Sequence, residues 1–79
     1  MPILFRIKNI VFYFYSSEHL PIHLHIRAGE KRAKIEVETG KVNYNKGFNA
    51  KDIKLFQMFI KKEQPFIKES WNEYFKTTR

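Results

Sequence analysis

The sequence predicts an α+β domain in which an antiparallel sheet of four to five strands precedes one kinked helix or two helices packed on one face. Up to about residue 45, apolar and polar residues alternate in short runs separated by turn residues, which is typical of strands. Further on, apolar residues recur every three or four positions, the period of an amphipathic helix. We therefore expect a single domain over residues 1–79, with the sheet in 1–45 and the helices in 49–77.

Two runs near the N-terminus predict a hairpin. Residues 3–8 alternate weakly, and a Lys-Asn pair gives a turn signal before residues 10–15, which are rich in β-branched and aromatic side chains. In that second run Tyr13 and Tyr15 fall on the opposite face from the phenylalanines. Because a phenol can keep its hydroxyl in water, we expect the tyrosine face to be the outer one.

Three more strands are predicted at residues 22–27, 32–38 and 42–44. The turn between the first two contains Gly29, which can take a positive φ. The two-residue period separates inward apolar residues from an outward set that consists of His23, His25, Arg27, Lys34, Glu36 and Glu38.

The helical period follows the sheet. Asn49 is a suitable N-cap, and Asp52 places a carboxylate in the first turn. Pro65 lacks a backbone N–H, so it should kink the helix or divide it into helices near 50–63 and 65–76. The apolar stripes that we expect to cover the sheet are Ile53, Phe56, Phe59, Ile60, Ile67, Trp71, Tyr74 and Phe75.

Composition limits the classes of function. The net charge of +7 favours an anionic partner, with nucleic acid first and an acidic protein or membrane surface next. The absence of cysteine excludes disulfides and thiolate metal sites. Arg6 and Lys8 interrupt a very short apolar run, so we expect neither a signal peptide nor a membrane-spanning helix. The expected protein is cytoplasmic, does not bind a membrane, and has no cofactor.

The density of histidine marks the candidate site, because all three histidines of the chain fall within seven positions. His23 and His25 share the outward face of their predicted strand with Arg27. The preceding connection carries Glu18 and His19 to one end of that strand. Nothing else in the sequence points as clearly to chemistry.

Three interpretations of this face stay open. A metal site would use the His-x-His pair, whose imidazoles are spaced about 6.6 Å along a strand, with a third ligand from Glu18, His19, Glu30 or Glu36. A metal-independent ribonuclease would use one histidine as base and another as acid, with Arg27 holding the phosphate and a tyrosine stacking a base. The third interpretation is a non-catalytic face covered by a partner protein or a second copy.

Several motifs extend over nearly the whole chain. They are Met1-Pro2-Ile3-Leu4, Phe12-Tyr13-Phe14-Tyr15-Ser16, Glu18-His19-x-Pro21-x-His23-x-His25-Ile26, Ala33-Lys34-Ile35 and Trp71-Asn72-Glu73-Tyr74-Phe75. Together they resemble the small bacterial proteins called domain of unknown function 4160. The resemblance implies a single intracellular domain, often encoded beside or fused to domain of unknown function 2442 in a suspected toxin–antitoxin pair, without an established activity. Ile22 stands where a second proline is common, and Pro65 interrupts a helical run that is usually continuous.

We therefore predict a basic toxin–antitoxin protein whose His/Arg/Tyr face engages RNA, with metal-independent ribonuclease activity as the sharper hypothesis. The alternative is a non-catalytic protein-interaction module, or a homodimer, that binds an acidic partner through the same face. The catalytic candidates are Glu18, His19, His23, His25 and Arg27. The RNA- or partner-binding candidates are Arg6, Tyr13, Tyr15 and Lys34. No metal ligand is assigned, and the expected partners are an antitoxin-like protein and RNA.

Overall fold

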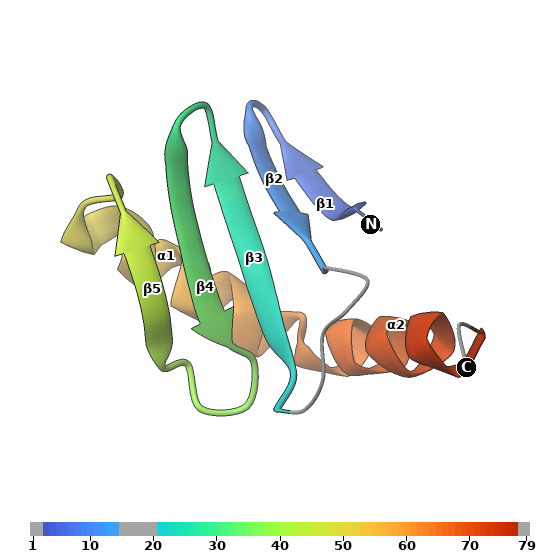
Figure 1. Cartoon of the computed structure of the whole chain (residues 1–79). Coiled ribbons are helices and arrows are strands. Elements are labelled where there is room, and N and C mark those ends of the chain that lie inside the picture. The colour runs from blue at the N-terminus through green and yellow to red at the C-terminus, as the bar shows by residue number, and fades with distance from the viewer. Residues whose placement is uncertain (1–2, 15–20, 78–79) are drawn as a thin grey trace.

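A five-stranded antiparallel sheet and two helices make up the computed structural model, which describes residues 3–14 and 21–77. The strands are β1 (Ile3–Ile7), β2 (Ile10–Tyr13), β3 (His23–Ala28), β4 (Lys31–Glu36) and β5 (Val42–Lys46). They lie side by side in sequence order, and the helices α1 (Ala50–Lys62) and α2 (Gln64–Thr77) cover one face of the sheet (Figure 1). The predicted α+β class is confirmed, with five strands and two helices.

Tight turns fix the register of the two hairpins. Gly29, with a φ of 63°, joins β3 to β4 in the left-handed region that glycine occupies without a Cβ clash. Lys8, with a φ of 56°, takes the same region between β1 and β2. Because each strand pairs with the next along the chain, all connections within the sheet are local.

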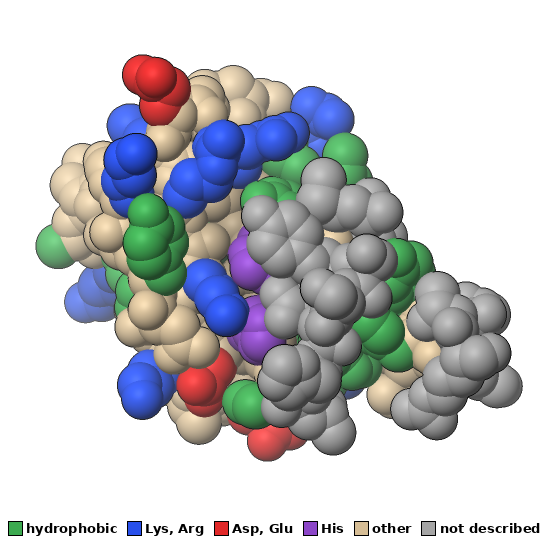
Figure 2. Space-filling model, in the orientation of Figure 1, with side chains coloured by type: hydrophobic (Ala, Val, Ile, Leu, Met, Phe, Trp, Pro, Cys, Tyr) green, Lys and Arg blue, Asp and Glu red, His purple; other side chains and the backbone are tan. Residues whose placement is uncertain are grey.

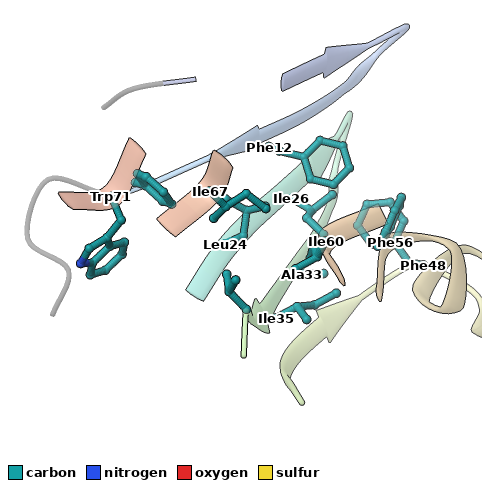
Figure 3. Close-up of a cluster of buried hydrophobic side chains, with 12 residues drawn as sticks. Phe12, Leu24, Ile26, Ala33, Ile35, Phe48, Phe56, Ile60, Ile67 and Trp71 are labelled. Carbon is teal, nitrogen blue, oxygen red and sulfur yellow. The ribbon is translucent and has the colours of Figure 1, made fainter. Parts of the chain in front are cut away.

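The main core lies between the sheet and the helices. Phe12, Leu24, Ile26 and Ile35 project from the sheet towards side chains of the helices (Figure 3). Phe12 is only 2% exposed, and its ring centroid lies 5.2–6.0 Å from three others, those of Phe5, Phe56 and Phe59. The buried helix residues, Phe56, Ile60, Ile67 and Trp71, belong to the stripes predicted from the helical period.

Local signals set the helix boundaries. The Asn49 side-chain oxygen accepts a hydrogen bond of 2.8 Å from the Asp52 N–H, which caps α1 as predicted. Glu63 alone separates α1 from α2, and Pro65 lies in the first turn of α2, where its missing N–H has no helical acceptor to lose. The chain therefore forms two helices. None of the described helices is both long enough and apolar enough to cross a membrane.

Helix side chains also hold the connection between β4 and β5. The contacts are Gln57 Nε2 to the Gly40 carbonyl at 2.7 Å, Gln64 Nε2 to the Val37 carbonyl at 2.8 Å, and Lys68 Nζ to Glu38 Oε1 at 2.8 Å. The hydrogen bond and positive charge of Lys68 lower the pKa of the Glu38 carboxyl. This connection leads directly into β5, so the helices help to position the last strand.

Candidate nucleic-acid interface

The sheet face opposite the helices, called the open face below, carries most of the predicted site residues that the structure describes. Strand register sorts its side chains into rows that run across the sheet, because residues opposite one another on antiparallel strands share a face. In Figure 2 the histidine side chains lie near the centre of this face, with Lys and Arg side chains above and to the left of them. Two of these rows carry aromatic and cationic groups.

The first row, called the aromatic row, consists of Tyr13, His25, Lys34 and Tyr44, which are successive partners across β2, β3, β4 and β5. The rings of Tyr13 and His25 stack with an interplanar angle of 22° and a centroid distance of 5.4 Å. Tyr44 is 51% exposed. Together with Arg32, the row lines a pocket of about 300 Å³ on the open face.

The second row, called the cation row, consists of Arg6, Arg27, Arg32 and Lys46, with Val11 between the first two. Arg32 stands directly opposite both Arg27 and Lys46, and neighbouring strands are about 4.8 Å apart. None of these four cations forms an ion pair with a carboxylate in the described part of the chain. The row thus concentrates positive charge that no acidic side chain of the described residues neutralises.

Contacts within the protein orient the two central arginines. The Arg27 guanidinium carbon lies 5.8 Å from the centroid of the Tyr13 ring, which is within the range of a cation–π contact. Nη1 of Arg32 donates to the carbonyls of Gly29 and Lys31 at 2.9 and 3.2 Å. The two arginines are therefore partly ordered before any ligand arrives.

His23 and His25 are adjacent, with ring centroids 5.6 Å apart. Nδ1 of His23 lies 2.8 Å from the Pro21 carbonyl oxygen. Because a carbonyl only accepts, this nitrogen must carry the proton, and Nε2 is the basic nitrogen of the neutral ring. His23 pairs with Glu36 on β4. The centroid of the His23 ring also lies 6.3 Å from the centroid of the Trp71 ring on α2.

The prediction that these rings are exposed is wrong. Tyr13, His23 and His25 share the open face as predicted, but they are only 3%, 6% and 9% exposed. Sequence alternation gives the side of a sheet and not the accessibility of a ring. The ring contacts of Tyr13 with His25 across the strands, and of His25 with His23 along β3, contribute to this burial.

The other predicted residues divide into three groups. Arg6 is exposed in the cation row, whereas Arg27, Lys34 and Glu36 are partly buried on the open face. Three candidates lie outside the described residues, namely Tyr15, Glu18 and His19. Within residues 3–14 and 21–77, no three His, Cys, Asp or Glu side chains cluster closely enough to hold a metal ion.

Sequence reasoning missed Arg32, Tyr44 and Lys46 as site residues. Arg32 could have been found, because it is two positions from Lys34 on the same strand. Tyr44 could not have been found in this way. Val42 packs against the core, and strict alternation would put Tyr44, two residues later, on that same face of the sheet. A bulge shifts the pairing from Ile35–Val42 to Lys34–Tyr44 and returns Tyr44 to the open face, followed by Lys46.

Comparison with known proteins adds one match. The family model described as Domain of unknown function (DUF4160) matches residues 9–72. Neither a curated protein nor a solved structure matches the chain. The matched span contains the whole aromatic row and every member of the cation row except Arg6.

Proposed function

We propose that this chain, which belongs to the domain of unknown function 4160 family, binds single-stranded RNA across the open face of its sheet. The observation that carries the proposal is the cation row lying beside the aromatic row. Phosphates would contact the cations, and a base would stack on Tyr44, the exposed ring at the end of the aromatic row. These are the two kinds of contact by which proteins hold single strands.

The arrangement of the cations supports a polyanionic ligand. Like charges directly opposite on neighbouring strands destabilise a sheet. Arg32 faces a like charge on both sides, Arg27 on β3 and Lys46 on β5. Bound phosphates would relieve this repulsion and release counterions into solution. The net charge of +7 adds long-range attraction for the same class of ligand.

The aromatic row supports a nucleic acid over a simple polyanion. Tyr44 offers an exposed ring at the edge of the pocket, where a base can stack. The two rows are two residues apart along each strand, a separation of about 6.6 Å. One nucleotide can span that distance from its phosphate to its base.

The position of the helices favours single-stranded RNA over a duplex as the ligand. Both α1 and α2 pack on the face opposite these rows, so neither is placed to enter a major groove from the open face (Figure 1). Unpaired bases, in contrast, can splay out and lie on an open sheet. RNA is therefore expected to bind more tightly as a single strand than as a duplex of the same length.

Replacing Tyr44 by alanine is expected to weaken the binding of a labelled oligouridine by roughly tenfold, because one base loses its stacking partner. Tyr44→Phe keeps the ring and should bind within about twofold of the parent chain. Fluorescence anisotropy measures both affinities, with the corresponding DNA as a parallel ligand. Leu55→Ala, an exposed change on the helix side, is the control. Equal binding by Tyr44→Ala and the parent chain would contradict a stacking role.

Metal-independent cleavage of the bound RNA is a second hypothesis. It is favoured by the 5.6 Å separation of the His23 and His25 rings and by the basic Nε2 of His23. Both rings are buried, however, and cleavage needs them to reach the ribose, whereas binding does not. RNA binding is therefore the primary proposal.

Incubating end-labelled RNA with the protein in the presence of a chelator tests this hypothesis. Cleavage should give products with cyclic phosphate ends, and a folded His23→Asn, His25→Asn double variant purified in the same way should give none. RNA that stays intact with the parent chain removes the ribonuclease hypothesis and leaves the binding proposal standing. The toxin–antitoxin role, the antitoxin-like partner and the alternative of an acidic protein on this face stay predictions.

A further inference from the structure

The outer surface of α1 has an unusual composition. Each exposed residue between positions 51 and 62 is lysine, leucine or methionine. These residues, called the outer stripe, are Lys51, Lys54, Leu55, Met58, Lys61 and Lys62. At 3.6 residues per turn they fall within about 120° of the helix circumference. The buried side chains Phe56 and Ile60 point the other way, into the core.

Helix stability does not account for the stripe. Lys61 and Lys62 lie in the last turn, where cations interact favourably with the helix dipole. Lys51, however, lies in the first turn, where a positive charge is unfavourable, and it repels Lys54 three residues away. No carboxylate among the described residues forms an ion pair with any of the four lysines. The four lysines can therefore pair with carboxylates of another molecule.

The apolar part of the stripe is also exposed. Leu55 and Met58 are 53% and 59% exposed and lie three residues apart, about one helical turn. They form an apolar centre with lysines before and after them along the helix. Methionine adapts its shape to different partners and is common on binding surfaces.

We propose that the outer stripe of α1 is a docking surface for an acidic amphipathic helix of another protein. Leu55 and Met58 would pack against apolar residues of that helix, and its flanking carboxylates would pair with the lysines. A second copy of the stripe does not fit, because four lysines would face four lysines. An anionic membrane fits less well, since two side chains bury little apolar area and the larger apolar face of α1 already packs on the sheet.

The surface is separate from the RNA-binding proposal. In Figure 1, α1 lies behind the sheet, on the side away from the open face. A partner helix on α1 would therefore leave the cation row and the aromatic row accessible. Docking on α1 does not depend on whether RNA binds.

A synthetic peptide of about 20 residues, designed as a helix with a leucine stripe between glutamates, tests the proposal. Fluorescence anisotropy with the full chain should show binding at least roughly fivefold tighter than that of a scrambled peptide of equal composition. The double variant Leu55→Ser, Met58→Ser should lose this preference. The double variant Lys51→Glu, Lys54→Glu should bind roughly tenfold more weakly. The matched control Lys8→Glu, Lys41→Glu, with the same change of net charge outside α1 and outside the cation row, should stay within about twofold.

Three outcomes would overturn the proposal. The first is equal binding of the scrambled and amphipathic peptides, which would indicate unspecific attraction between charges. The second is binding of phosphatidylglycerol vesicles, but not of the peptide, that disappears in both stripe variants. The third is a dimer, detected by sedimentation of the parent chain, that the change Leu55→Ser, Met58→Ser dissociates.

Discussion

Replacing Arg27 and Arg32 together by glutamate is expected to reduce affinity for single-stranded RNA by at least roughly a hundredfold at about 0.1 M salt. Both arginines lie at the centre of the cation row, so the change replaces two phosphate contacts with two repulsive ones. The milder change to glutamine should keep weak binding. It should also reduce the slope of log affinity against log salt by roughly 1.4, which is the value for two lost contacts with a single strand.

A salt series of anisotropy titrations measures both quantities. The matched control is Lys51→Glu with Lys54→Glu, which makes the same change of net charge on the outer face of α1. It should alter RNA affinity far less than the open-face change, because its effect is confined to screened long-range attraction. Equal losses in the two variants would mean that RNA responds to net charge alone, and the cation row would have no special role.

Phe12→Ala is expected to lower the free energy of unfolding by about 3–5 kcal/mol, the largest effect on stability that we foresee. Phe12 is 2% exposed and packs between β1 and α1, against the rings of Phe5, Phe56 and Phe59. The truncation leaves a cavity that these rigid rings cannot close. A chain of 79 residues has a total stability of about 4–12 kcal/mol, so this variant should be close to unfolded at room temperature.

The matched control for Phe12 is Phe66→Ala, the same substitution at a side chain that is 48% exposed. Phe66 contacts Phe5 at a centroid distance of 5.5 Å, so a loss of about 1 kcal/mol is expected. Urea unfolding followed by circular dichroism measures both changes. Equal losses in the two variants would contradict the position of the core between the sheet and the helices.

Local signals were enough to predict the fold. Gly29 marks a turn, Asn49 caps the first helix, and Pro65 divides the helical region, and each acts through its own backbone or side chain over a few residues. The strands pair in sequence order, so no long-range pairing had to be found. The choice between one kinked helix and two needed the structure, because both satisfy the restriction that Pro65 imposes.

The site was predicted only in part. Alternation correctly placed His23, His25 and Arg27 on the open face with Tyr13. It did not reveal that Tyr13, His23 and His25 are buried, because the burial of a side chain depends on everything that packs against it and not on its side of the sheet alone. It also missed Tyr44, whose side of the sheet is decided by a bulge that no sequence period marks. The roles of the predicted site residues stay predictions.

Binding of RNA across the open face can be mapped by nuclear magnetic resonance of isotopically labelled protein titrated with oligouridine. We expect the largest changes in backbone amide shifts on β3, β4 and β5, around Arg27, Arg32 and Tyr44, and little change on α1. Shift changes concentrated on α1 and α2, or no changes at RNA concentrations well above the protein concentration, would contradict binding across the open face.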